Sequence, residues 1–324
     1  MKVKNKNSHK INTASPHGNS HGSNSGKKKL FWAIAAIPLL LVALIVWGLI
    51  EPYILDNEEE EAIIPNLPAA WEGKKIGQVS DFQVGMWGDN TYTVAKSVEK
   101  LIEEDSDAVF ITGDFIYHAN PDHKTEINRV VNLLRPLTEA NIPTYAVLGN
   151  HDYGMKSKKS EPDNKLATEL ERGLESIGID VLNNEAVAIP LQGKESDLHV
   201  VGVDSHWAKS DRIDRALSQL PTDTPRIVMV HNPDSFLDFP VNTAPLAIAG
   251  HTHGGQIRLP YLPQWSWLSF AKNDKVVSDG WIDKKYGNAG NKLYVNRGIG
   301  FSDVPIRINC APEITFFTLK SQAK

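Results

Sequence analysis

Short apolar runs rich in β-branched residues alternate along the chain with segments whose apolar positions recur every three or four residues. The runs predict buried strands, and the recurring positions predict amphipathic helices. The strand-like runs are 76–79, 109–112, 145–148, 198–203, 226–230, 246–249, 292–296 and 313–319. Helical spacing covers 94–102, 127–134, 166–177 and 213–220. Early β–α alternation followed by clustered strands predicts an α/β fold with two packed sheets flanked by helices.

One segment near the N-terminus, Leu30 to Ile50, is apolar and carries no charge. As a helix, these 21 residues span about 30 Å, the thickness of a bilayer core. A cleaved signal peptide and a buried core helix are the alternatives. Glu51-Pro52-Tyr53 does not resemble a small-residue cleavage site, and the segment has no polar face. We therefore expect one N-terminal transmembrane helix at 30–50.

The segments on either side of this helix differ in charge. Residues 1–29 are polar and lysine-rich and should form a disordered basic tail. Residues 51–71 are acidic and contain three prolines, which predicts an extended stalk before a catalytic domain at 72–324. Positive charge before the span predicts a cytoplasmic N-terminus and a catalytic domain on the outer side of the cytoplasmic membrane. The lipid bilayer is thus an expected partner.

Net charge and cysteine content narrow the function further. All 39 acidic residues follow position 29, together with 27 of the 34 basic residues, so this part carries a net charge of −12. Such an acidic domain is poorly suited to bind nucleic acid, and we expect no nucleic-acid partner. Cys310 is the only cysteine, so neither an intrachain disulfide nor a multi-thiolate metal site can form.

Acids, amides and imidazoles recur directly after the strand-like runs. The fragments are Ser80-Asp81-Phe82-Gln83, Gly113-Asp114, Gly149-Asn150-His151-Asp152, His231 and Gly250-His251-Thr252-His253. Residues at successive strand ends can meet at one edge of a sheet. Oxygen ligands mixed with imidazole suit Mn²⁺, Fe or Zn²⁺. Taken singly each residue could be structural, but the ordered set predicts a metal site.

The five fragments, in this order, resemble the motifs of the calcineurin-like metallophosphoesterases: D-x-H, G-D, G-N-H, H and G-H-x-H. Residues 251–260 and Asn296-Arg297-Gly298-Ile299-Gly300 also resemble the YkuE/YaeI-like branch of that family. The resemblance covers about residues 74 to 320 and implies a four-layer αββα sandwich. It also implies two divalent metal ions, for which we expect Mn²⁺, with Fe or Zn²⁺ as alternatives.

The resemblance assigns roles to individual residues. Asp81, Gln83, Asp114 and His253 would hold the first metal; Asp114, Asn150, His231 and His251 would hold the second, with Asp114 bridging. His151 resembles the catalytic histidine that assists the leaving oxygen. Gln83 stands where the commoner motif has histidine, which favours Mn²⁺ or Fe over Zn²⁺. Tyr117 stands where many relatives have an aspartate, so Tyr117, His118 or a backbone carbonyl could orient His151.

Two further groups of residues have alternative interpretations. Arg258 and Arg297 could bind phosphate oxygens or form salt bridges. The second group is Met86, Trp87, Tyr261, Trp265, Trp267, Phe270 and Trp281. These side chains could line the substrate cleft, contact lipid, or form a hydrophobic cluster under a loop.

The sequence therefore predicts a membrane-anchored di-metal phosphoesterase. We expect a metal-activated hydroxide to hydrolyse a phosphodiester or pyrophosphate bond in an envelope or lipid-linked substrate. The alternatives are a broad phosphomonoesterase and a non-catalytic scaffold that retains the metal site.

Overall fold

The computed structural model describes residues 24–117, 123–194, 196–259, 262–267, 269 and 278–322. The chain divides into two units, residues 1–44 and 45–324. Helix α1, Asn24–Ile50, passes from the first unit into the second. An 18-residue window within the segment Lys29–Tyr53 has a mean hydropathy of 2.8, and the segment is long and apolar enough to cross a membrane. Most of the predicted basic tail, residues 1–23, lies outside the described residues.

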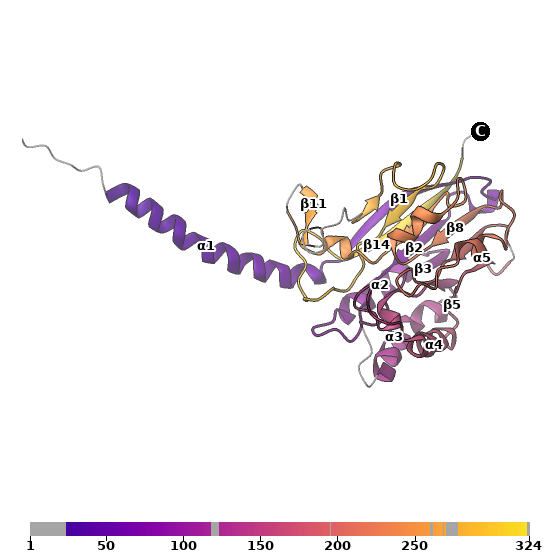
Figure 1. Cartoon of the computed structure of the whole chain (residues 1–324), viewed down its shortest axis with the longest axis horizontal. Helices are drawn as coiled ribbons and strands as arrows, with labels where there is room; N and C mark the ends of the chain where they lie inside the picture. The colour runs from indigo at the N-terminus through magenta and orange to yellow at the C-terminus, as the bar shows by residue number, and fades with distance from the viewer. Residues whose placement is uncertain are drawn as a thin grey trace, which may run out of the picture. The chain divides into compact units, whose positions relative to one another are not determined.

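The second unit contains two six-stranded sheets. The first has the order β1-β14-β2-β3-β4-β5, and part of it is visible in Figure 1. Its strands are β1 (Asp56–Ile64), β2 (Lys75–Val79), β3 (Ala108–Ile111), β4 (Thr144–Ala146), β5 (Asp180–Val181) and β14 (Glu313–Ser321). Pairing is parallel throughout except between β14 and β2.

The second sheet has the order β12-β13-β9-β8-β7-β6. Its strands are β6 (Glu185–Ala188), β7 (His199–Gly202), β8 (Arg226–Met229), β9 (Ala247–Ala249), β12 (Gly280–Trp281) and β13 (Leu293–Val295). The four central strands β13, β9, β8 and β7 run parallel, and the two edge strands pair antiparallel. A separate hairpin joins β10 (Arg258–Leu259) to β11 (Leu262–Ser266).

The helices of this unit confirm the four helical patterns of the sequence. They are α2 (Thr91–Glu103), α3 (His123–Glu139), α4 (Asn164–Glu175) and the short α5 (Ile213–Leu217). Five 3-10 helices occur in the described residues: η1 (Glu51–Tyr53), η2 (Ala69–Trp71), η3 (His151–Tyr153), η4 (Pro233–Asp238) and η5 (His253–Gly255).

Three hydrophobic clusters explain how these elements stack, because alternate residues of a strand face opposite sides of its sheet. On β8, Ile227 and Met229 point into the cluster between the two sheets, whereas Val228 points outward. The outer face of the first sheet packs against α2, α3 and α4. The outer face of the second sheet is covered by α5 and η4. The predicted mixed α/β fold with two packed sheets is thus confirmed.

The predicted extended stalk is wrong for residues 56–64. These residues form β1, which pairs in parallel with β14 over nine residue pairs from Asp56–Glu313 to Ile64–Ser321. Ala62 and Ile64 point into the buried core, while most of the acidic side chains stay partly or fully exposed. Charged residues are common on edge strands, where they discourage pairing with other chains. The folded unit therefore begins before residue 72.

Candidate metal centre

The strand-end residues predicted to bind metal come together where the two sheets meet. Asp81 and Gln83 follow β2, Asp114 follows β3, and Asn150 follows β4 in the first sheet. From the second sheet, His231 follows β8, and His251 and His253 follow β9. We call these seven residues the ligand cluster. The connections are closely packed: a Cβ on Gly149 would lie 2.1 Å from Asp114 Oδ1, and one on Gly250 would lie 1.9 Å from Ser80 Oγ. Glycine is therefore required at both positions.

The backbone is strained at five members of the ligand cluster. These non-glycine residues have positive φ angles: Asp81 (55°), Gln83 (52°), Asp114 (57°), His251 (74°) and His253 (48°). Such conformations are uncommon in side-chain-bearing residues and concentrate at functional sites. The strain turns consecutive side chains away from the strand direction and towards a common centre. Strand-end position alone does not produce this arrangement.

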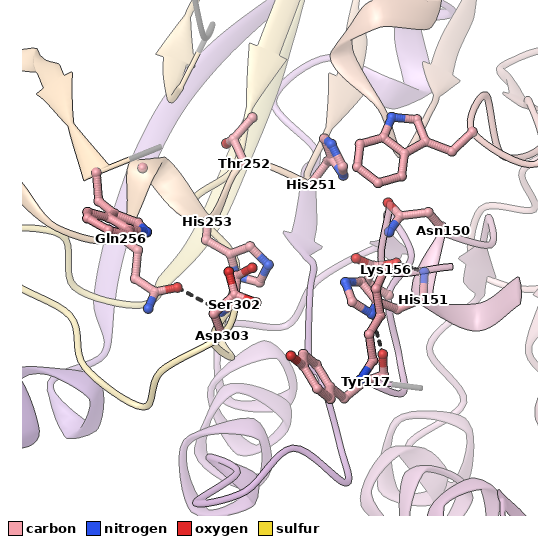
Figure 2. A pocket seen from close by; sticks show the side chains of 14 residues that line it. Tyr117, Asn150, His151, Lys156, His251, Thr252, His253, Gln256, Ser302 and Asp303 are labelled. Atoms are coloured by element: carbon pink, nitrogen blue, oxygen red, sulfur yellow. Dashed lines mark hydrogen bonds between the residues drawn. The ribbon is translucent and has the colours of Figure 1, made fainter. Parts of the chain in front are cut away.

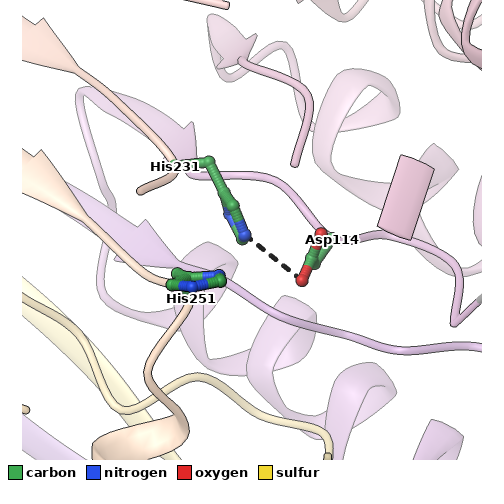
Figure 3. Close-up of side chains that lie close together, drawn as sticks. All are labelled: Asp114, His231 and His251. Carbon is green, nitrogen blue, oxygen red and sulfur yellow. Dashed lines mark ion pairs between the residues drawn. The ribbon is translucent and has the colours of Figure 1, made fainter. Parts of the chain in front are cut away.

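Asp114 belongs to two groups of potential ligand atoms, and Figure 3 shows the first of them, with His231 and His251. One group of potential ligand atoms combines Asp114 with His231 and His251, and a second combines it with Asp81 and His253; within each group the atoms lie within 4.8 Å of one another. His231 Nδ1 lies 2.7 Å from the Thr112 carbonyl oxygen, and its Nε2 lies 3.2 Å from Asp114 Oδ2. Asp114 is thus common to both groups, as the sequence-based bridging role requires.

Burial and charge set the protonation of the central pair. Burial would raise the pKa of Asp114, but the neighbouring imidazoles of His231 and His151 outweigh it and hold this pKa below its usual range. Burial would lower the pKa of His231, yet the Asp114 carboxylate raises it to about 9. Burial raises the pKa of Asp81 to about 6. Asp114 is therefore ionised and paired with a protonated His231, and a cation bound at this site would compete with that proton for the carboxylate.

Two amide side chains indicate that metal ions fit here. The Gln83 amide nitrogen donates to Asp114 Oδ2 at 2.9 Å, and the Asn150 amide nitrogen donates to the Met155 carbonyl oxygen at 2.9 Å. Their oxygens, Gln83 Oε1 and Asn150 Oδ1, are buried and accept no hydrogen bond from any described residue. A buried acceptor without a partner is costly. Together with carboxylates and imidazoles, these oxygens form a donor set that suits a divalent cation.

His151 lies beside the ligand cluster, at the start of η3. Its Nδ1 is hydrogen-bonded to the Tyr117 carbonyl oxygen, and its ring stacks on the Tyr117 ring with centroids 5.1 Å apart. Burial lowers the pKa of this histidine. Of the three groups that the sequence left open for orienting His151, the structure identifies the Tyr117 backbone; His118 lies outside the described residues.

Asp152 is a buried residue of this region that sequence reasoning did not assign. Its carboxylate accepts hydrogen bonds from four backbone amides, those of Asp114, Phe115, Ile116 and Gly149, at 2.8–3.2 Å. These bonds hold the loop after β3 against the loop after β4. Asp152 therefore positions Asp114 and Asn150 without facing the pocket. Its place directly after His151 was the available signal.

A pocket opens beside the ligand cluster (Figure 2). Its wall includes Asp114, Asn150, His151, His251 and His253. The remaining lining residues are Tyr117, Lys156, Trp207, Thr252, Gly255, Gln256, Trp267, Ser302 and Asp303. The Lys156 ammonium lies 5.4 Å from the centre of the Tyr117 ring, and Trp207 packs edge-on against His251 at 4.8 Å. The pocket thus places an exposed lysine and an aromatic wall next to His151.

The two arginines predicted to bind phosphate are engaged elsewhere. Arg258 Nη1 pairs with Asp279 at 2.9 Å, and Arg297 pairs with Asp56, Glu58 and Glu313 at 2.7–3.0 Å. Neither lines the pocket, and both are largely buried. Both residues thus form the salt bridges that the sequence left open as an alternative, and phosphate binding by either one stays a prediction.

The predicted aromatic group divides among different environments. Trp267 lines the pocket, Met86 is buried, and Trp281 packs edge-on against Tyr294 and Phe317 at 5.4 and 6.2 Å. Trp87 and Trp265 are exposed. Tyr261 and Phe270 lie outside the described residues. The group is thus not one cluster: Trp267 lines the cleft, Met86 is buried, and Trp281 packs on two core residues while 39% exposed.

The fold and the site define a metal-dependent hydrolase of the α/β class, and comparison with known proteins identifies the family. The profile of the calcineurin-like phosphoesterase family matches residues 74–255. The metallophosphoesterase YkuE of Bacillus subtilis is 31% identical over 84% of this chain and 88% of its own length. The phosphodiesterase YaeI of Escherichia coli is 32% identical over 70% of this chain and 75% of its own length.

A third relative, the UDP-2,3-diacylglucosamine pyrophosphatase LpxG of Chlamydia muridarum, is 24% identical over 83% of this chain and 90% of its own length. The chain belongs to the calcineurin-like metallophosphoesterase family, in the branch that contains YkuE and YaeI. It is a metal-dependent phosphoester hydrolase that binds divalent metal.

Proposed function

We propose that this protein is a membrane-anchored phosphoesterase that hydrolyses a phosphodiester or pyrophosphate bond of an envelope or lipid-linked substrate. One observation carries the proposal: two potential ligand groups share Asp114, and both lie beside a pocket that His151 lines. A metal-dependent phosphoesterase needs this combination, because the divalent-ion site and the proton-transfer group must both reach the same phosphorus centre.

Within this proposal, Asp81, Gln83, Asp114 and His253 hold one metal ion, and Asp114, Asn150, His231 and His251 hold the other. When bound, two divalent ions supply the positive charge that activates water and neutralises the phosphoryl oxygens. Gln83 contributes an amide oxygen, a harder and weaker donor than imidazole, so we infer Mn²⁺ as the working metal, ahead of Fe or Zn²⁺.

The chain's own residues then divide the remaining work. The hydrogen bond from His151 Nδ1 to the Tyr117 carbonyl leaves Nε2 to give a proton to the leaving oxygen. Lys156 reaches the pocket with a cation that can bind a non-reacting phosphate oxygen. Trp207 and Trp267 provide flat apolar walls that exclude water from part of the pocket.

Two relatives support a diester or pyrophosphate rather than a simple phosphomonoester. YaeI is named a phosphodiesterase, and LpxG is named a pyrophosphatase of a diacylated nucleotide sugar. The second name joins a pyrophosphate to a lipid, which agrees with an enzyme held at a membrane. Because LpxG shares only 24% identity with this chain, the lipid-linked class, and not that molecule, is the proposal.

The test is turnover by the full chain, purified in detergent and loaded with Mn²⁺. Bis(p-nitrophenyl) phosphate should be hydrolysed faster than p-nitrophenyl phosphate. A clear preference for the monoester would support the phosphomonoesterase alternative. Two bound metal ions per chain without turnover of either compound would support a scaffold, although the presence of His151 argues against it.

Anchoring and orientation form the second part of the proposal. The apolar segment Lys29–Tyr53 is preceded by lysines and followed by acidic residues, which favours a cytoplasmic N-terminus. Alkaline phosphatase fused after Leu319 should then be active in cells, because it works only outside the cytoplasm. Green fluorescent protein that fluoresces at the same junction would reverse the orientation, and a chain recovered without membranes would contradict the anchor.

A further inference from the structure

Exposed apolar side chains gather around the point where α1 enters the second unit. They come from η1, the loop before α2, the start of α2, the β10–β11 region and the loop before β14. Their exposed fractions range from 37% to 64%: Tyr53, Ile54, Trp87, Tyr92, Leu259, Trp265, Trp267 and Val304. We call this set the aromatic rim. Isolated exposed apolar residues are ordinary, but a contiguous group with five large aromatic rings marks an interaction surface.

Contacts within the second unit connect the last turn of α1 to this rim. A Cβ on Gly48 would lie 2.5 Å from Ile306 and 3.0 Å from Ile308, so the helix packs directly on this loop. The Arg307 backbone amide donates to the Gly48 carbonyl oxygen at 3.0 Å. The buried Glu51 carboxylate accepts from the Asn309 backbone amide at 2.8 Å. The end of α1 is therefore built into the folded unit.

Further contacts join the other segments of the rim. The Pro52 carbonyl oxygen accepts from Asn90 and Thr93 at 2.7 and 3.0 Å, which fixes η1 to the start of α2. The Tyr53 and Tyr92 rings lie 6.2 Å apart. The Trp87 indole donates to the Asp303 carbonyl oxygen at 3.1 Å. The rim is therefore one ordered surface assembled from distant parts of the sequence.

The aromatic rim borders the pocket. Trp267 belongs to both, and Ser302 and Asp303, which line the pocket, directly precede Val304 of the rim. The Gln256 side chain lines the pocket and also holds this loop, accepting from Ser302 at 2.7 Å and donating to the Val304 carbonyl oxygen at 2.8 Å. A partner seated on the rim would therefore lie beside the entrance to the ligand cluster.

We infer that the aromatic rim docks on the lipid bilayer surface and holds the pocket entrance at the depth of the phospholipid headgroups. Residues 45–50, the end of the apolar helix, belong to the second unit and adjoin this surface, so a bilayer that holds the rest of the helix begins within a few residues of the rim. Tryptophan and tyrosine, with an apolar body and a polar tip, are the side chains preferred at that depth. The acidic domain has no general attraction to anionic lipid, so docking depends on aromatic burial.

This inference rests on the anchor in the proposed function but not on the phosphodiesterase chemistry. It narrows the substrate to an amphiphile whose phosphoester lies at the headgroup layer. A docked pocket would receive such a molecule without lifting its acyl chains out of the bilayer. Soluble phosphoesters would reach the same ligand cluster only from the side that faces away from the lipid.

A single-cysteine probe tests docking in the full chain. Cys310 is buried, so a cysteine introduced on the surface is labelled selectively. Tyr92→Cys, in the rim, and Lys165→Cys, on α4 with 81% of the side chain exposed, form the test and control positions. Each carries a polarity-sensitive fluorophore, and each chain is reconstituted in phosphatidylcholine vesicles that contain a headgroup-depth or an acyl-depth quencher.

We expect the label at position 92 to shift to the blue and to be quenched by the headgroup-depth probe, whereas the label at 165 stays aqueous. If the chain floats with the vesicles but the fluorophores at positions 92 and 165 both report water, docking is overturned and the anchor stays intact. A chain that does not float would overturn the anchor, and docking with it. Neither outcome depends on whether the enzyme is a phosphodiesterase.

A matched pair of substitutions tests the consequence for catalysis. Leu259 in the rim and Leu237 on η4, over the outer face of the second sheet, are 49% and 47% exposed. Leu259→Glu should reduce turnover of a vesicle-embedded diacylglycerol p-nitrophenyl phosphodiester by about tenfold, the effect expected for one buried leucine. Its turnover of bis(p-nitrophenyl) phosphate should not change. Leu237→Glu should alter neither. Equal effects of the two variants on the embedded substrate would overturn the inference.

Discussion

Two groups of polar and charged residues in the second unit, one buried and one extending from the buried Glu313 to the surface, differ in whether their members pair with one another. The ligand cluster contains carboxylates, amides and imidazoles, and some of its buried acceptor atoms receive no hydrogen bond from any described residue. The second group, which we call the Arg297 cluster, consists of Asp56, Glu58, Asp279, Arg297 and Glu313. Arg297 pairs with the four acids at 2.7–3.8 Å.

The difference separates a structural cluster from a functional one. The Arg297 cluster supplies its own cation, and it fastens the edge strand β1 to β14 and to the loop that carries Gly298. In the ligand cluster, His231 pairs with Asp114, but the buried oxygens Gln83 Oε1 and Asn150 Oδ1 have no partner among the described residues, and five members lie on strained backbone. A fold retains such an open arrangement when an ion or substrate completes it. Satisfaction of buried polar atoms, more than residue type, thus distinguishes the two clusters.

The largest effect should follow from Asp114→Asn, because this carboxylate belongs to both ligand groups. The amide can still accept from the His151 backbone, so the loop should fold. We expect metal affinity to fall by at least about 100-fold and turnover to fall with it, since even residues outside the coordination sphere cost 10–100-fold. Elemental analysis and turnover after Mn²⁺ loading measure both. Two tightly bound ions in an active Asp114→Asn enzyme would contradict the bridging role.

His151→Ala should be next in size and should separate proton transfer from metal binding. Metal content should stay at the wild-type level, while turnover of substrates with poor leaving groups should fall by about 10²–10⁴-fold. Leaving groups of low pKa need no proton, so the loss should shrink along a series of substituted phenyl esters. A loss of the same size across the whole series would remove His151 from the proton-donor role.

The ligand residues were predictable from sequence because each follows directly on a strand that its own β-branched run encodes. Ile76–Val79 and Leu246–Ala249 identify their strands locally, and the parallel topology of each sheet then brings Asp81 beside Asp114 in the first sheet and His231 beside His251 in the second. A common edge within each sheet is a geometric consequence of strand order, whereas the positive φ angles that turn these side chains towards one centre are not visible in the sequence. The sequence therefore contained both the donor types and their approximate meeting place.

Other features could not be predicted because they depend on non-local pairing. Strand β1 reads as an acidic solvated segment, since neither its partner β14 nor Arg297, more than 230 positions away, is visible locally. The orientation of His151 uses the Tyr117 backbone carbonyl, a group that every residue has and that leaves no mark in the sequence. The sequence could not decide between phosphate binding and salt bridges for Arg297 for the same reason: its carboxylate partners are assembled only by the fold.

Arg297→Gln tests the satisfied cluster. Removing the guanidinium leaves Glu313, a fully buried carboxylate, without its main counter-charge. We expect the free energy of unfolding to fall by about 3–5 kcal/mol, as for other broken buried pairs. Urea unfolding of the full chain in detergent measures this change. Arg215→Gln, which removes an exposed pair with Glu185 at 4.0 Å, is the control and should change stability by less than about 1 kcal/mol.

The Michaelis constant distinguishes this structural role from phosphate binding. KM for bis(p-nitrophenyl) phosphate should stay within about twofold of wild type, because no substrate contact is lost. A rise in KM of tenfold or more at unchanged stability would restore Arg297 as a phosphate clamp. The comparison between the two clusters would then no longer hold.

The smallest expected effect concerns the pair His206–Asp211, whose side chains are more exposed than the ligand cluster but are not fully exposed. His206 Nδ1 lies 2.7 Å from Asp211, with 33% of the histidine side chain exposed. This hydrogen bond raises the pKa of His206 against the opposing effect of burial; Asp234 adds to the rise and Lys158 opposes it.

Because the pKa of His206 is higher in the folded than in the unfolded state, the pair stabilises the fold below the unfolded pKa of about 6.5, and this contribution is lost as pH rises through the folded pKa. His206→Gln should therefore be less stable than wild type by up to about 1 kcal/mol at pH 5.5, and the difference should shrink as pH rises through the folded pKa. A stability difference that instead widens with pH would mean that folding favours the neutral imidazole. The His206–Asp211 pair would then not be a stabilising ion pair of the kind found in the Arg297 cluster.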